Sequence, residues 1–203
     1  MTVDRERVAH LTRELLVAIG EDPDRAGLRQ TPHRVADAYA EFYAGLGQDP
    51  AEPLSHTISV SRGPAPDTLP SGAVLLRGIR FRSMCEHHLL PFAGHAHIAY
   101  LPGEEVVGLG ALPKVVDVLA ARPQVQERLG EQIADAIDGA IDTRGVLVVL
   151  DAVHQCVTMR GGRQSDSSTV TIAARGELAE PAARGEIVSL IALGGGVSPE
   201  EAG

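Results

Sequence analysis

Aromatic side chains are scarce in this chain. It has no tryptophan, three tyrosines and three phenylalanines among its 203 residues. Proteins that bind single-stranded nucleic acid commonly stack bases on aromatic rings, so this scarcity argues against such a function. Basic side chains are also in the minority, with 18 lysines and arginines against 27 acidic residues and a net charge of -9. The overall field repels polyanions, and we expect no nucleic-acid partner.

Long apolar runs are absent as well. No stretch approaches the length of a membrane span, and the charged residues 4–7 leave no apolar core for a signal peptide. We therefore expect a cytoplasmic protein with no membrane partner. Hydrophobic residues still make up 44% of the chain and charged residues 22%, which is typical of a globular protein with a substantial core.

Cysteine is equally rare, since Cys85 and Cys156 are the only two. So low a content fits a reducing compartment, in which thiols persist. A disulfide between the two residues is the alternative. Because each cysteine has histidine beside it, we favour metal-binding thiolates over a bridge.

Apolar periodicity in the first third of the chain predicts two amphipathic helices. The first spans residues 4–19, and its apolar stripe consists of Val8, Leu11, Leu15 and Ile19. The second begins with Thr31 as N-cap and Pro32 in the first turn, and its buried side consists of Val35, Tyr39, Phe42 and Leu46. Turn-forming residues then surround a short strand at 57–60. We take residues 1–72 as a helical arm with a linker and residues 73–203 as the main domain.

The main domain is predicted to alternate paired strands and helices. Strands are expected at 73–83, 94–101, 146–150 and 169–172, and helices at 112–121, 123–142 and 180–193. The first two strands would form a hairpin around residues 85–88. Hairpins with helices on one face define an α+β domain. If the strand at 146–150 continues, His154 and Cys156 point to the same face.

Two short segments carry a metal-site pattern. Cys85 and His88 are separated by two residues, and His154 and Cys156 by one. Thiolate and imidazole are common zinc ligands, and three of them leave a position open for catalysis. Cys85, His88 and Cys156 are therefore our predicted ligands. Spacing alone also permits His87 in place of His88, or a structural zinc whose fourth ligand is His87 or His154.

Other polar residues are more ambiguous. His95 and His97 lie two apart in a predicted strand and are an alternative ligand pair, although strand histidines often have no such role. Gln126 and Glu127 lie off the apolar stripe of their helix and, taken alone, indicate a plain exposed face. Arginine binds phosphate through forked donors, and the candidates for a local basic pocket are Arg160, Arg163 and Lys114.

Several motifs together resemble one known family. Residues 83–92, 122–129 and 154–157 followed by Arg160 and Gly161 closely resemble the signatures of GTP cyclohydrolase I. Residues 20–25 and 31–36 resemble the helical arm of that family. The resemblance runs in order over roughly residues 8–193. It implies a tunnelling fold, in which two hairpins and two helices per subunit assemble into a ring, typically a homodecamer with active sites between subunits.

The resemblance also implies roles for individual residues. Cys85, His88 and Cys156 match the zinc ligands of the family. His87 and His154 match its proton-handling histidines, and the substrate-binding positions are Glu127 for guanine, Arg160 for the triphosphate, Gln126 and Lys114. The implied reaction opens the guanine ring of GTP at C8, releases formate and closes a pterin ring to give 7,8-dihydroneopterin triphosphate. Zinc would supply the nucleophile at neutral pH.

One segment departs from the family pattern. The family usually has Gly-Leu-Ser-Lys followed shortly by arginine, whereas this chain has Gly110, Ala111 and Lys114 at those positions. We predict that the C8 chemistry is retained and that triphosphate affinity or the later sugar rearrangement is altered. Gly162 and residues 164–166 also differ from the common pattern. The alternatives are a divergent paralogue, acting on another guanine nucleotide or stopping at the formamidopyrimidine, and a catalytically silent nucleotide-binding or regulatory relative. The presence of His87, His88 and His154 argues against a catalytically silent relative.

Overall fold

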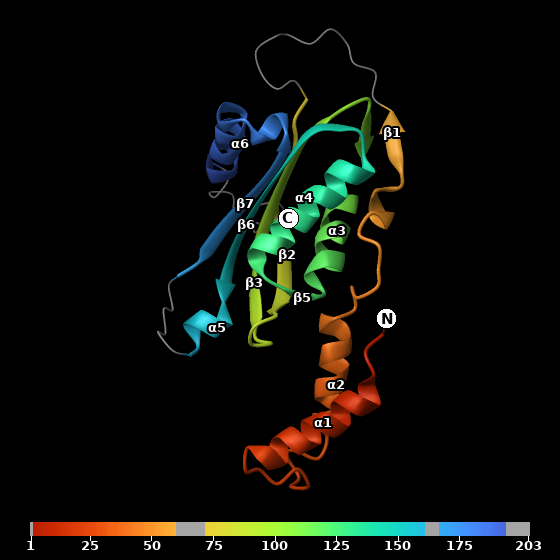
Figure 1. Cartoon of the computed structure of the whole chain (residues 1–203), viewed down its shortest axis with the longest axis vertical. Coiled ribbons are helices and arrows are strands. Elements are labelled where there is room, and N and C mark those ends of the chain that lie inside the picture. Colours follow the sequence, from red (N-terminus) through yellow and green to blue (C-terminus); the bar gives the residue numbers. More distant parts are fainter. Residues whose placement is uncertain (1, 60–71, 161–166, 194–203) are drawn as a thin grey trace, which may run out of the picture.

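The N-terminal region forms a pair of helices that extends away from a sheet domain (Figure 1). The computed structural model describes residues 2–59, 72–160 and 167–193. Helix α1 spans Arg5–Ala18 and helix α2 spans Thr31–Phe42. A 3-10 turn, η1 at Glu52–Leu54, and the short strand β1 at Thr57–Ser59 lead toward the sheet.

A five-stranded sheet is the centre of the main domain. Its strands stand in the order β5-β2-β3-β6-β7, and all neighbours are antiparallel except β5 and β2. The strands are β2 Val74–Cys85, β3 Pro91–Pro102, β5 Pro123–Gln124, β6 Thr143–His154 and β7 Thr169–Gly176. A separate two-stranded sheet joins β1 to β4 at Glu105–Val107.

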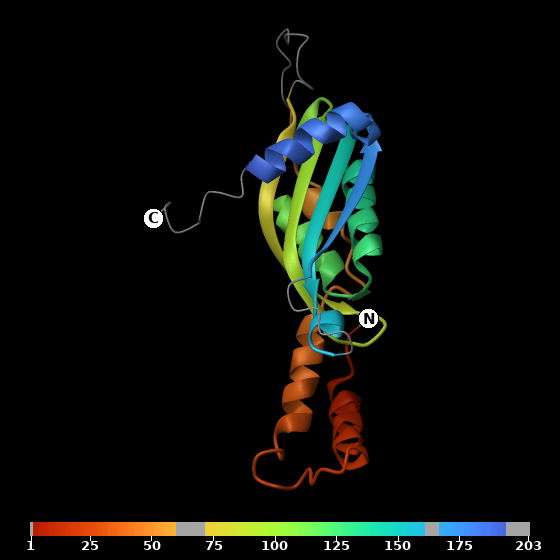
Figure 2. The ribbon, with the colours of Figure 1, turned by 90° about the vertical axis from the view of Figure 1, so that its left-hand side faces the viewer.

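Helices lie on both faces of this sheet. Helix α3, Ala111–Ala120, and helix α4, Gln126–Ala140, bury their apolar sides against one face and form the main core. Helix α6, Pro181–Leu193, follows the 3-10 turn η2 at Glu177–Ala179 and packs on one end of the other face (Figure 2). The predicted α+β class is confirmed, with hairpins β2–β3 and β6–β7 and two helices between them in the chain. This is the subunit arrangement of a tunnelling fold.

Most predicted elements are confirmed, and the differences have local causes. The helix predicted from residue 123 begins at Gln126, because Pro123 and Gln124 pair with the end of β2 as strand β5. Its stripe at Leu129, Ile133 and Ile137 is fully buried, as predicted. The N-cap of α2 is Gln30, which makes no side-chain capping bond, and Thr31 is already helical.

The apolar stripe predicted for the first helix is mostly exposed within the single chain. Leu11, Leu15 and Ile19 are 55%, 60% and 66% exposed, because α1 packs beside α2 outside the main core. Leu46, predicted on the buried side of α2, follows the end of that helix and is exposed.

Among the described residues, no helix has the length and apolar character needed to cross a membrane. The division at residue 72 stays a prediction.

Gly94 in β3 lies where no side chain fits, which gives a testable prediction. A Cβ there would stand 1.9 Å from the carbonyl oxygen of Asp151 and 2.6 Å from the Cα of Ala152, both in β6. Because the two strands must shift apart, Gly94→Ala is expected to lower the free energy of unfolding by about 1 to 3 kcal/mol or more. Chemical denaturation at fixed protein concentration measures the change.

The matched control is Gly139→Ala in α4, where an added Cβ meets nothing within 4 Å. Replacing a helical glycine by alanine is expected to raise the free energy of unfolding by about 0.5 to 1 kcal/mol. An unchanged or higher free energy of unfolding in Gly94→Ala would contradict the close approach of β3 and β6 at Gly94.

Candidate metal centre

The first ligand segment is a tight turn at the end of β2. Cys85 is the last residue of that strand, and its amide donates to the carbonyl oxygen of Leu90 at 2.9 Å. The amide of Leu89 donates back to the carbonyl oxygen of Cys85 at 2.8 Å, and Leu89 adopts a left-handed φ of 51°. These bonds close the β2–β3 hairpin and place His88 beside Cys85.

The second ligand segment lies where β6 ends. His154 is the last residue of β6, and Cys156 belongs to the short helix α5, Gln155–Thr158. The expectation that both residues continue one strand face is therefore wrong, since the chain turns into a helix between them. Phe92 at the start of β3 is the register partner of His154, so the end of β6 lies next to the hairpin turn.

Three predicted ligands converge at this point. The potential ligand atoms of Cys85, His88 and Cys156 all lie within 4.8 Å of one another. A tetrahedral zinc with bonds of about 2.0 to 2.3 Å holds its ligand atoms about 3.3 to 3.8 Å apart, so a small closure of the cluster completes the geometry. His87 and His154 are not members of this group, which is the only such group among residues 2–59, 72–160 and 167–193.

The two thiols are free, so the alternative of a disulfide is wrong. Burial raises the pKa of the Cys156 thiol, and the neighbouring Cys85 raises that pKa further. Arg160 acts in the opposite direction. A divalent metal ion bound here would supply the positive charge that favours the thiolate form of a cysteine ligand.

An ion pair that was not predicted from the sequence stabilises the hairpin turn. Arg128 in α4 pairs with Glu86, and it also donates to the carbonyl oxygen of Pro123 and to Oε1 of Gln124, both at 3.1 Å. The hydrogen bond from Arg128 lowers the pKa of Glu86. His87 lies on the exposed side of the turn, with Nε2 3.9 Å from the Glu86 carboxylate. The turn is thus tied to the start of α4.

His154 is fixed by two buried neighbours. Its ring stacks on Phe92 with centroids 4.6 Å apart and an angle of 4° between the planes. Its Nε2 lies 2.7 Å from Oε1 of Gln126. Burial lowers the pKa of His154, and Glu127 partly opposes that shift. Gln126 is only 1% exposed, so the interpretation of its position as a plain exposed face is wrong, whereas Glu127 is exposed.

The remaining candidates lie outside this group of three potential ligands. Arg160 is exposed just beyond α5 and acts electrostatically on Cys156. Lys114 is exposed on α3. His95 and His97 belong to no group of three potential metal ligands in the described part of the chain. Gly161, Gly162, Arg163 and residues 164–166 lie outside the described residues.

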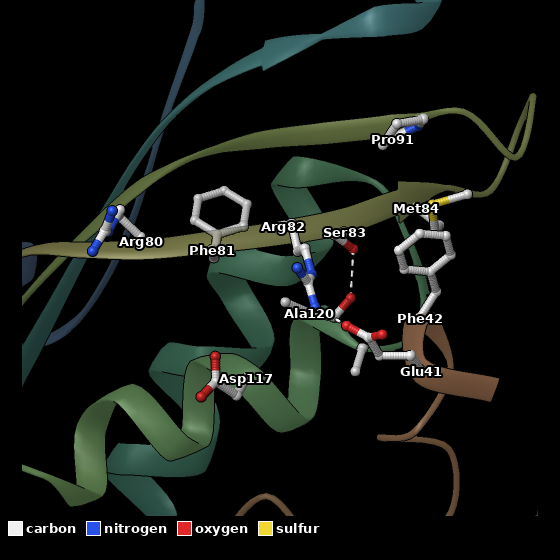
Figure 3. A pocket seen from close by; sticks show the side chains of 11 residues that line it. Glu41, Phe42, Arg80, Phe81, Arg82, Ser83, Met84, Pro91, Asp117 and Ala120 are labelled. Atoms are coloured by element: carbon white, nitrogen blue, oxygen red, sulfur yellow. Dashed lines mark hydrogen bonds and ion pairs between the residues drawn. The ribbon is translucent and has the colours of Figure 1, made fainter. Parts of the chain in front are cut away.

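A cavity of about 500 Å³ lies elsewhere, between the end of α2, strand β2 and α3. Figure 3 shows the ion pair of Arg82 with Glu41 at its rim and the bond from Ser83 Oγ to the carbonyl oxygen of Ala120, at 2.7 Å. Asp117 lines the same cavity, and burial raises the pKa of its carboxyl group. None of the three potential metal ligands lines this cavity.

The fold and the cluster define a tunnelling-fold protein with a cysteine–histidine group that could hold a metal ion. The family model of GTP cyclohydrolase I matches residues 8–192. The chain belongs to the GTP cyclohydrolase I family, and it is an enzyme of that class.

Relatives in several bacteria agree with this assignment. GTP cyclohydrolase 1 of Leifsonia xyli subsp. xyli is 59% identical over 191 residues, covering 94% of this chain and 97% of the relative. The proteins of the same name from Streptomyces avermitilis and Carboxydothermus hydrogenoformans are 47% and 49% identical, each over 93% of this chain and over 90% and 95% of the relative. A solved structure, the archaeosine synthase QueF-Like in the apo form, aligns with a TM-score of 0.42 and 15% identity over 57% of this chain and 97% of that chain, a likeness too weak to bear on function.

Proposed function

We propose that this enzyme hydrolyses GTP at C8 of the guanine, releases formate and forms 7,8-dihydroneopterin triphosphate, with zinc held by Cys85, His88 and Cys156. The observation that carries the proposal is the convergence of two thiols and one imidazole, within 4.8 Å of one another, in a member of this family. Zinc bound by three side chains keeps a position open and generates a nucleophile at neutral pH.

The two histidines outside the ligand group handle protons. Imidazole titrates near neutral pH and is suited to protonating a nitrogen that leaves carbon. His154 is half-buried and held against Phe92, which favours transfer at a defined position. His87 is exposed on the hairpin turn beside Glu86, so it exchanges protons readily with solvent.

Glu127 and Arg160 bind the two ends of the nucleotide. A carboxylate accepts the paired N–H donors on one edge of guanine, and Glu127 directly follows Gln126, which contacts His154. The guanidinium of Arg160 lies four residues after Cys156 and is free of the main core, so it can reach the triphosphate.

We also propose that the chain assembles into a ring homo-oligomer, with a decamer as the expected size. Apolar side chains exposed on α1, Leu11 and Leu15 among them, need cover from another chain. The outer strand β7 also exposes Val170 and Ile172. In such a ring, Lys114 on α3 completes the phosphate end of a neighbouring subunit's site.

A second candidate function follows from the start of α3. Gly110 precedes this helix and Ala111 begins it, so neither a hydroxyl nor an ammonium group is available there. An enzyme lacking these groups can act on another guanine nucleotide, or it can stop at the ring-opened formamidopyrimidine.

One experiment separates these functions. Zinc-loaded protein is incubated with GTP, GDP, GMP and guanosine, and formate and pterin fluorescence are measured separately. Formate with pterin from GTP supports the first function, and formate without pterin supports the second. No formate from any of the four compounds overturns both.

Adding the missing charge tests the role of position 111. Ala111→Lys is expected to lower the Kd of GTP by about 10-fold to 100-fold, because one charge-assisted hydrogen bond contributes about 1.5 to 3 kcal/mol. Isothermal titration with GTP and with guanosine measures the effect, which should be confined to the phosphorylated ligand. Ala182→Lys, at an exposed position of α6, is the control for net charge. An equal gain in both variants would show a general effect of net charge. No gain at position 111 would show that other basic groups already bind the phosphates.

A further inference from the structure

Gln126 holds its side-chain amide between two strands. The residue is 1% exposed, and its amide nitrogen donates to the carbonyl oxygens of Leu150 at 3.1 Å and Thr169 at 2.8 Å. The hydroxyl of Thr171 lies 3.3 Å from the same nitrogen. Leu150 belongs to β6 and Thr169 to β7, so the two amide hydrogens have acceptors on neighbouring strands.

These contacts fix which end of the amide faces His154. Rotating the amide by 180° would turn its oxygen toward two carbonyl oxygens, which are acceptors themselves. Oε1 must therefore be the atom that lies 2.7 Å from His154 Nε2. Because an amide oxygen only accepts, the hydrogen of this bond belongs to Nε2.

We propose that Gln126 is a positioning residue: its Oε1 accepts the hydrogen bond from Nε2 of His154, which fixes the orientation of the imidazole and leaves Nδ1 as the ring nitrogen not bonded to Gln126. The proposal rests on the proton-handling role proposed above for His154. It gives Gln126 a function different from the substrate contact that the family resemblance implies.

The stacking of His154 on Phe92 completes the restraint. The parallel ring of Phe92 fixes the plane of the imidazole, and the bond to Gln126 fixes its rotation within that plane. Phe92 is buried and is the register partner of His154, so the support is built into the β3–β6 pairing.

Gln126→Leu removes the acceptor and keeps the side chain apolar and similar in size. We expect kcat for formate release from GTP to fall by about 10²-fold, which is the lower end of what a positioned proton donor contributes. The KM and the Kd of GTP should change by less than about threefold, since the transition-state interaction is the one removed. Gln126→Glu should recover part of kcat, because a protonated carboxyl group can donate to Thr169 and accept from Nε2.

Gln124→Leu is the matched control. Gln124 is also 1% exposed, and its amide donates to the carbonyl oxygen of Leu119 at 3.0 Å and to Gln132 Oε1 at 2.9 Å. Nitrogen-15 NMR of histidine-labelled protein should show the Nε2–H tautomer of His154 in the unaltered enzyme and in Gln124→Leu. The same spectrum should show a mixture of tautomers in Gln126→Leu.

A double-mutant cycle separates positioning from general damage. In a His154→Phe background, Gln126→Leu should cause no further loss of kcat, whereas Gln124→Leu should have the same effect in both backgrounds. An equal loss from Gln126→Leu in both backgrounds, a raised KM with unchanged kcat, or an unchanged histidine spectrum would each overturn the proposal.

The same measurements show which assignment fails. If the unaltered enzyme releases no formate from GTP, the proposed function is wrong. If His154→Phe is fully active, the role of His154 is wrong. If both assignments hold and Gln126→Leu keeps its full kcat, only the positioning role of Gln126 is wrong.

Discussion

Replacing Cys156 by alanine is expected to leave the enzyme without zinc and without formate release. Metal binding at a closed four-ligand site contributes about 10 to 16 kcal/mol, so each ligand accounts for roughly 2.5 to 4 kcal/mol, and its loss is expected to lower the affinity by about 10² to 10³. Metal content after dialysis against a weak chelator, measured by atomic emission, checks the result. Cys156 is on the short helix α5 and is only partly buried at the edge of the main core, so the fold should persist.

Val157→Ala is the matched control, because Val157 is the next residue of the same short helix and its side chain is exposed. It should retain one equivalent of zinc per chain. Cys156→Asp should recover part of the binding, since a carboxylate is also a zinc ligand. Full zinc content in Cys156→Ala would remove this residue from the ligand set, whatever happened to activity.

Replacing His154 by phenylalanine is expected to lower kcat by about 10² to 10⁴ while zinc content stays at its normal value. The substituted ring keeps the stack on Phe92 and loses both nitrogens, so the change removes proton transfer and preserves packing. Formate release under saturating GTP measures kcat, and the metal assay on the same sample measures zinc.

His95→Phe is the control for this substitution. His95 is exposed on β3 and stands opposite Asp151 in the register, outside the group of potential ligands. It should keep the kcat of the unaltered enzyme. A loss of zinc in His154→Phe would instead identify His154 as a fourth ligand, and equal losses of kcat in the two variants would contradict the assignment of proton transfer to His154.

Sequence similarity along nearly the whole chain shows that it belongs to the GTP cyclohydrolase I family. The structure adds the contacts that hold the residues of the candidate site in place. The turn at residues 85–88 is tied to α4 through Glu86 and Arg128. His154 is tied to the same helix through Gln126. The start of α4 therefore contacts both the hairpin turn that carries Cys85 and His88 and the end of β6 that leads to Cys156.

The sequence by itself determined the features that depend on near neighbours. The apolar stripe of α4 repeats every four residues, and helix geometry alone places those residues on one side. The turn between Cys85 and His88 is local as well. The cysteine–histidine motifs also pointed to the three residues whose potential ligand atoms the structure brings within 4.8 Å of one another, because the residue types alone indicate metal-binding chemistry.

Only the tertiary structure decided how distant segments meet. Gln126 bonds residues 24 and 43 positions away, so its burial follows from the pairing of β6 and β7 and has no local signal. The exposure of Leu11 and Leu15 could not be predicted from the sequence either. A periodic stripe predicts an apolar side of a helix but does not say which surface covers it. Spacing left His87 and His88 equivalent, and the backbone bonds of the hairpin turn, closed by Leu89 and Leu90, brought His88 to the two thiols.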